Sequence, residues 1–317
     1  MNLNDPIFTD EAKAREYFEG IMWPKGPYCP HCGEAKRVYR LEGKSHRPGL
    51  FHCNSCHGAF TVTTGGVMES SHIPLTKWAL GFRLYAGSKK GFSAHQLHRT
   101  LGITYKSAWF MAHRIREAMG DDSPAPMGGK DKTIEIDETY FGPKQKVAPG
   151  SRKGRRGTGG KAKVVTLVER KGSARSFKVE NMDVSTVKKI VQENVAKGGA
   201  LMTDESGLYT NLGSPLEGHF ISHGTTMHSA EEFVKKDNPL VHSNTVENFF
   251  SVFKHGMRGV YQHCDEKHLH RYLKEFDFRY SNRAALGVDD LVRTMRAVKG
   301  AEGKRLTYRP AHGLKAA

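Results

Sequence analysis

Four cysteines near the N-terminus constrain the fold of this chain more than any other feature. Cys29 and Cys32 form one C-x2-C pair, and Cys53 and Cys56 form a second pair after twenty intervening residues. Each pair can direct two thiolates at one ion, and two pairs complete the tetrahedral sulfur site of structural zinc. Two disulfides are the alternative, which a reducing cytosol disfavours. We therefore predict a zinc ribbon over residues 23–66, whose zinc stabilises the fold and takes no part in chemistry.

A fifth cysteine lies in a second group of potential metal ligands. Cys264 is surrounded by His263, His268 and His270. This spacing could form another metal site, but it is also typical of the start of a polar helix, and we favour the helix.

The charge balance points to a polyanionic partner. The 317 residues include 49 Lys plus Arg against 33 Asp plus Glu, a formal net charge of +16. Such an excess favours nucleic acid or an anionic membrane surface. No stretch approaches the roughly 18 apolar residues of a membrane span, and the acidic first twenty residues do not resemble a secretory signal. We predict a cytoplasmic protein that binds nucleic acid and no membrane; a merely basic enzyme is the alternative.

Helical patterns flank the zinc ribbon. We expect a short N-terminal helix within residues 1–22 and three helices within residues 74–120. Ser93 and Thr104 are candidate N-caps of the second and third of these helices, and Gly102 suits the turn between them. A helix, a short turn with glycine and another helix are typical of a helix-turn-helix DNA-binding domain.

The third of these helices carries two stripes of side chains. One stripe is apolar, and the other repeats at three- and four-residue steps, as expected for one helix face. We predict that this second stripe contacts DNA, although a plain three-helix packing unit is the alternative. Its members are Lys106, Trp109, His113 and Arg116.

The remainder of the chain predicts an α/β domain. After a linker at 121–132, three strands that we expect to pair antiparallel precede a helix and a fourth strand, and helices then dominate. This order is typical of a ribonuclease-H-like sheet, so the predicted fold class is multidomain α+β and α/β. We place this domain at residues 133–300 and a tail at 301–317.

The stretch 143–163 is a basic insertion in that domain. It contains eight Lys or Arg residues, many glycines and no acid. One-signed charge at this density favours phosphate contact, with a solvated loop as the alternative. The predicted DNA contacts are Arg152, Lys153, Arg155 and Arg156.

Three acidic residues stand out by context. Asp137 and Asp204 each end a predicted buried strand, and Glu247 lies early in a predicted helix. Carboxylates at such positions are costly unless cations compensate them, and oxygen ligands select Mg²⁺ or Mn²⁺. A pair of these ions can promote phosphoryl displacement. The alternatives are ordinary turn, cap and surface acids, or ligation by the neighbouring Glu138 and Glu205.

The helix that carries Glu247 adds two cations. Lys254 follows at i+7, which places it within about 20° of Glu247 around the axis and roughly 10 Å along it. Arg258 follows at i+11. One helix face thus offers a metal carboxylate followed by phosphate-binding cations.

The stretches YCPHCG, FHCNSCHGAF, IEIDETYFG, TDESGLY and HSNTVENFFSVFKHGMRGVYQH resemble insertion-sequence transposases of the DDE type, in particular their ISXO-like subgroup. The resemblance extends from about Phe18 to Arg283. It implies a ribonuclease-H-like catalytic domain that binds two Mg²⁺ or Mn²⁺ ions through Asp137, Asp204 and Glu247, with Lys254 as a catalytic phosphate ligand.

The resemblance also implies the activity. We expect a DNA transposase that binds terminal inverted repeats, cleaves double-stranded DNA and joins the freed ends to a target. It would act as a homodimer or larger assembly on DNA, in the bacterial cytoplasm and associated with the nucleoid. The alternatives are a structure-selective nuclease of the same fold and a zinc-ribbon DNA-binding regulator without catalysis.

Overall fold

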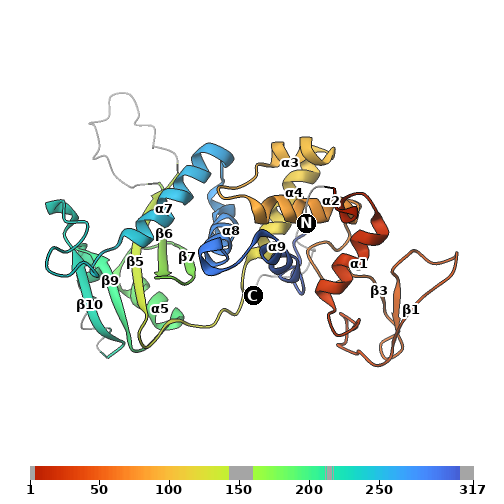
Figure 1. Ribbon diagram of the computed structural model, residues 1–317, viewed down its shortest axis with the longest axis horizontal. Helices are drawn as coiled ribbons and strands as arrows, with labels where there is room; N and C mark the ends of the chain where they lie inside the picture. The colour runs from red at the N-terminus through yellow and green to blue at the C-terminus, as the bar shows by residue number, and fades with distance from the viewer. Residues whose placement is uncertain (1–3, 143–159, 211, 213–215, 217, 308–317) are drawn as a thin grey trace. The chain divides into compact units, whose positions relative to one another are not determined.

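Two separated stretches of sequence build the first structural unit, and the segment between them builds the second. The computed structural model describes residues 4–142, 160–210, 212, 216 and 218–307. The first unit comprises the chain up to Asp121 together with the residues from Val288 on, and the second comprises Asp122–Gly287 (Figure 1).

The zinc ribbon is a small antiparallel sheet in the first unit. Its strands are β1 (Val38–Arg40), β2 (Phe51–Cys53) and β3 (Ala59–Phe60), with β2 in the centre. The ring of Trp23 packs edge-on against Phe51 and Phe60, with centroid distances of 5.3 and 5.8 Å. This small apolar core is typical of a domain too short to fold without a metal.

Helices form the rest of the first unit. They are α1 (Glu11–Met22), α2 (Leu75–Gly87), α3 (Ala94–Leu101), α4 (Tyr105–Met119) and α9 (Asp290–Lys299). The side chain of Ser93 accepts a hydrogen bond from the amide of Gln96 at the start of α3, and Thr104 caps α4 in the same way. Gly102 ends α3 with a φ of 57°, a left-handed conformation that glycine adopts at low cost.

Helix α9 corrects the predicted domain boundary. We predicted that the catalytic domain extends to residue 300, but α9 lies in the first unit, where it packs on α1, α2 and α4. Lys299 donates to the carbonyl of Met22 at 2.8 Å, and the amide of Gly303, in the predicted tail, donates to the carbonyl of Gly65 at 2.9 Å. An amphipathic pattern shows that a helix has an apolar face, but not which core covers it.

The second unit is built on a five-stranded mixed sheet. Its order is β10-β9-β5-β6-β7, for β10 (Phe220–Thr226), β9 (Gly199–Asp204), β5 (Thr133–Phe141), β6 (Ala162–Glu169) and β7 (Ala174–Val179). Strands β5, β6 and β7 pair antiparallel, whereas β9 runs parallel to both β5 and β10. The predicted basic insertion 143–163 therefore overlaps the start of β6.

Helices cover both faces of this sheet (Figure 1). One face packs Ile134 and Ile136 of β5 against α5 (Val184–Asn194) and the short α6 (Gly207–Thr210). The opposite face packs β6 and β7 against α7 (Asn244–Gly256) and α8 (Leu269–Ser281). Because side chains alternate along a strand, Glu135 and Asp137 lie on the α7 side of β5.

Part of the predicted linker 121–132 forms a short β-strand. Within it, β4 (Met127–Gly128) pairs in parallel with β8 (Val195–Ala196), which directly follows α5. Burial of Met127 with Ile134 and Val195 explains this pairing. Of the helices in the described ranges, none combines the length and apolarity needed to cross a bilayer.

Candidate functional site

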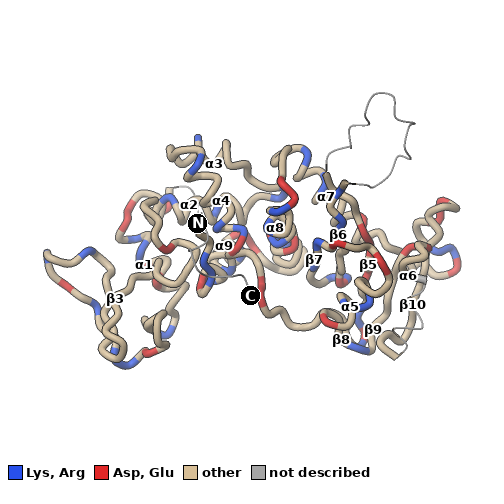
Figure 2. Tube along the Cα trace, turned by 180° about the vertical axis from the view of Figure 1, so that it is seen from behind, with Lys and Arg blue, Asp and Glu red and all other residues tan. Residues whose placement is uncertain are grey.

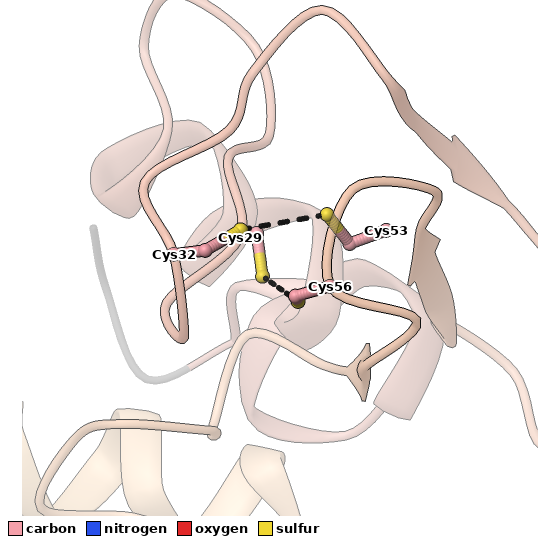
Figure 3. A group of neighbouring side chains, drawn as sticks. All are labelled: Cys29, Cys32, Cys53 and Cys56. Carbon is pink, nitrogen blue, oxygen red and sulfur yellow. Dashed lines mark hydrogen bonds between the residues drawn. The ribbon is translucent and has the colours of Figure 1, made fainter.

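The four cysteines of the zinc ribbon converge on one point (Figure 3). The sulfur of Cys29 lies 3.5 Å from that of Cys56, and the sulfurs of Cys32 and Cys53 are 3.7 Å apart. Four sulfurs about 2.3 Å from a central zinc would be separated by roughly 3.8 Å, so the arrangement fits a tetrahedral zinc site. None of these cysteines forms a disulfide.

The second site lies in the other unit, where β5 meets α7. Asp137 of β5 and Glu247 of α7 line an open cavity of about 620 Å³ together with Lys254 and Arg258. Figure 2 shows acidic positions along β5 and basic positions on α7. The i+7 and i+11 spacing on α7 brings Lys254 and Arg258 to the same cavity as Glu247.

Asp137 has an unusual electrostatic environment. Burial, with a smaller contribution from the negative charges of Glu138, Asp204 and Glu247, raises the pKa of its carboxyl group to about 8. Such repulsion between carboxylates is relieved when a cation binds among them, and an all-oxygen donor set fits Mg²⁺ or Mn²⁺. The donor chemistry of this site therefore suits a divalent ion.

Asp204 lies at the end of β9, next to β5 in the sheet. One carboxylate oxygen accepts a hydrogen bond from the amide of Ser206 at 3.0 Å. Within the described ranges, the four cysteines alone form a group of three or more potential ligands with donor atoms all within 4.8 Å of one another. The three acidic residues share one region but do not form so tight a cluster.

Glu138 and Glu205, the alternative metal ligands considered from the sequence, have other hydrogen-bond partners. Glu138 lies on the opposite side of β5 from Asp137 and accepts a hydrogen bond from the hydroxyl of Tyr209. Glu205 accepts from the amides of His228 and Ser229, both at 2.8 Å. These hydrogen bonds from backbone amides lower the pKa of Glu205 to about 2. The same hydrogen bonds connect Glu205 to the segment that follows β10.

Two residues beside Glu247 were not predicted as part of the site. The Nε2 atom of His228 lies 3.2 Å from the Oε1 atom of Glu247, and the hydroxyl of Ser243 donates to the same oxygen at 2.9 Å. Ser243 directly precedes α7, but its conformation could not be read from the sequence. His228 lies in the short helical turn after β10, 19 residues before Glu247, with no local pattern that marks it.

The predicted DNA-contact stripe of α4 is only partly accessible. His113 and Arg116 are each 1% exposed, which contradicts their assignment as groove contacts. The guanidinium of Arg116 lies over the ring of Tyr85, 5.4 Å from its centroid. Helix α4 packs against α2, α3 and α9, and its residues from 111 to 119 are buried except Glu117. Lys106 is exposed and Trp109 half-buried near the helix start.

The remaining predicted residues do not extend these sites. Arg152, Lys153, Arg155 and Arg156 lie outside the described residues. The group around Cys264 is not among the clusters of close ligand atoms in the described ranges. Instead, residues 266–268 form a helical turn leading into α8, and His268 pairs with Arg271, with 2.8 Å between Nδ1 and a guanidinium nitrogen.

Comparison with known families gives two matches. Residues 128–281 match the ISXO2-like transposase domain, and residues 9–58 match the transposase zinc-ribbon domain. The first match contains Asp137, Asp204 and Glu247, and the second contains the four clustered cysteines. No curated protein matches the chain.

Proposed function

Because the chain belongs to the ISXO2-like insertion-sequence transposases, we propose that it cleaves DNA at the ends of a mobile element and joins those ends to target DNA. The observation that carries this proposal is the cavity where Asp137 and Glu247 lie beside Lys254 and Arg258. Carboxylates for metal ions and cations for phosphate are the groups that phosphoryl transfer requires.

The topology of the second unit supports a ribonuclease-H-like catalytic domain. Three antiparallel strands, β5 to β7, are followed through α5 by β9, which returns parallel to β5. This connection places the end of β9, which carries Asp204, beside the middle of β5, which carries Asp137; β5 continues beyond the strand end expected at Asp137. Residues far apart in the sequence can thus act on one phosphodiester.

The side chains have distinct roles in this proposal. Asp137, Asp204 and Glu247 would hold the metal ions, with Glu247 contributed by α7. Two bound divalent ions would supply activation of the attacking oxygen and stabilisation of the leaving oxygen. Lys254 and Arg258 hold phosphates adjacent to the scissile one, as point-charge and bidentate donors respectively.

Both chemical steps are balanced without a further reactant. In cleavage, the oxygen of water bonds to phosphorus and a DNA 3′-oxygen leaves as the 3′-hydroxyl. In strand transfer, that hydroxyl attacks a phosphodiester of the target, whose own 3′-oxygen leaves. Two ends must be joined to one target, so we expect at least a dimer on DNA.

The first unit is proposed to recognise the ends of the element. The zinc ribbon and the α3–α4 pair, as a helix-turn-helix, would contact the DNA, with Lys106 and Trp109 at the accessible start of α4. The net charge of +16 supports binding to a polyanion. The basic residues at 152–156 would grip flanking or target DNA.

Asp137→Asn tests the proposal. We expect this variant to bind end DNA like the wild type but to lose cleavage and strand transfer in Mg²⁺, because one metal ligand is neutral. Wild-type nicking by Asp137→Asn would exclude Asp137 as a ligand. Lys254→Ala should retain metal binding and slow both steps.

Pre-cleaved ends distinguish the alternatives. A transposase joins pre-cleaved ends to a target, whereas a structure-selective nuclease cuts DNA but does not join it. A DNA-binding regulator shows no metal-dependent nicking by the wild type at all.

A further inference from the structure

A buried carboxylate links the strand that carries Asp137 to the helix that carries Glu247. Glu135 lies two residues before Asp137 on the same side of β5, and its side chain is fully buried. It accepts hydrogen bonds from the amides of Thr245 and Val246 at 2.8 and 2.9 Å and from the Thr245 hydroxyl at 2.7 Å. These donors form the first turn of α7.

Glu135 takes the place of the usual helix cap. The first amides of a helix have no partner within it, and the side chain of the N-cap residue commonly accepts from them. The N-cap residue of α7 is Ser243, a good capping residue, yet its side chain makes no capping hydrogen bond. A carboxylate from β5 satisfies these amides instead, where the helix dipole favours negative charge.

Capping by Glu135 leaves the Ser243 hydroxyl available for another acceptor. That hydroxyl is directed at Glu247 and donates to its Oε1 atom at 2.9 Å. Ser243 is 2% exposed, so water competes little for this contact. The orientation of Glu247 therefore depends on Glu135 through Ser243, besides depending on the position of the whole helix.

Arg170 completes the arrangement. Its Nε atom donates to Glu135 at 2.6 Å, and its two terminal nitrogens donate to the carbonyls of Leu240 and His242, both at 2.7 Å. The guanidinium thus compensates the buried charge and holds the segment that leads into α7. Strand and helix are joined by charge-assisted hydrogen bonds and not by apolar packing alone.

We propose that Glu135 is a positioning residue for Glu247: by capping α7 from β5, it fixes the helix against Asp137 and frees Ser243 to orient the Glu247 carboxylate. This inference rests on the proposed function, because it concerns the same metal site. Residues that orient metal ligands are typically worth 10- to 100-fold in metal affinity.

The test is Mn²⁺ binding to the full, zinc-loaded chain, measured by electron paramagnetic resonance of free Mn²⁺. The Kd of Glu135→Gln should rise about tenfold or more over the wild type. Glu275→Gln is the matched control, since Glu275 is also fully buried and paired with an arginine, Arg279, but on α8. The Kd of Glu275→Gln for Mn²⁺ should stay within about twofold of the wild-type value, even if its unfolding temperature falls as far as that of Glu135→Gln.

Ser243→Ala keeps the test decisive if Glu135→Gln does not fold. Because Ser243 does not cap α7, its loss should weaken Mn²⁺ binding severalfold and leave the unfolding temperature unchanged. A lower unfolding temperature with unchanged Mn²⁺ affinity would identify Ser243 as the true cap and overturn the proposal.

Asp137→Asn separates this proposal from the proposed function. If wild type and Asp137→Asn bind Mn²⁺ equally, the metal site itself is absent and both proposals fail. If the wild type binds Mn²⁺ more tightly than Asp137→Asn does, but Glu135→Gln binds it as tightly as the wild type, only the positioning role of Glu135 fails.

Discussion

The carboxylate of Asp277, on α8, accepts two hydrogen bonds from Ser176, on β7. The Ser176 amide donates at 2.8 Å and its hydroxyl at 2.7 Å. Burial nevertheless raises the pKa of Asp277 to about 7, because these two hydrogen bonds compensate only part of the desolvation of the charge.

This raised pKa predicts a pH dependence of stability. The folded state holds the Asp277 proton more tightly than the unfolded chain, where the ordinary value is 3.8. Its stabilising contribution is therefore complete below about pH 4 and is lost as pH rises to about 7, by at most roughly 1.4 kcal/mol per pH unit. Asp277→Asn should remove this slope.

Hydrogen–deuterium exchange of α8 measures that effect, with variant and wild type compared at each pH. The protection difference between them should change between pH 4 and 7 and level off above it. A constant difference across this range would show that Asp277 does not titrate there.

Zinc removal should unfold the ribbon. Because the apolar core of this sheet is small, ligation of zinc by the four thiolates supplies much of its stability. A chelator should therefore release one zinc per chain, and the unfolded ribbon should no longer bind end DNA. A colorimetric zinc assay measures the release. Cys53→Ser should lose the metal, whereas Cys264→Ser should retain it; loss from both would argue against the four-cysteine site.

Substitution by alanine should change the stability of the first unit in opposite directions at two of its glycines. A Cβ atom at Gly300 would lie 2.1 Å from the carbonyl oxygen of Ala118, whereas one at Gly20, an exposed position of α1, would meet nothing within 4 Å. Gly300→Ala should destabilise the unit by about 1–3 kcal/mol. Gly20→Ala should stabilise it by about 0.5–1 kcal/mol.

Urea unfolding followed by tryptophan fluorescence measures both changes. All three tryptophans, Trp23, Trp78 and Trp109, belong to the first unit, so the signal reports on that unit alone. Equal stability of Gly300→Ala and wild type would contradict the close packing of the end of α9 against α4.

Lys106 and Arg116 occupy one predicted stripe but should behave differently. Arg116→Ala removes a buried side chain that packs on Tyr85, and we expect a loss of about 2–4 kcal/mol in stability. Lys106→Ala should change stability by less than about 0.5 kcal/mol. It should weaken end-DNA binding and reduce the salt slope by about one.

Fluorescence-detected unfolding and DNA binding at several salt concentrations separate the two effects. An Arg116→Ala protein with wild-type stability and weakened DNA binding would restore Arg116 as a groove contact. Unchanged DNA affinity in Lys106→Ala would remove the start of α4 from the interface.

Features that depend on short spacings were predictable from the sequence. Two C-x2-C pairs direct four sulfurs at one ion whatever surrounds them, and the zinc-ribbon match agrees with that reading. The seven-residue step from Glu247 to Lys254 brings both to one cavity, because helix geometry does not depend on the rest of the fold. The caps Ser93 and Thr104 are local in the same sense.

Burial and distant pairing were decided only by the tertiary structure. The period of α4 revealed two stripes, but whether His113 and Arg116 face solvent depends on helices packed from elsewhere, including α9 from the other end of the chain. Likewise, Glu135 was inconspicuous because its partners lie 110 residues later. Local sequence determines the direction in which a side chain points along its element, whereas its neighbours are set by the long-range contacts of the folded chain.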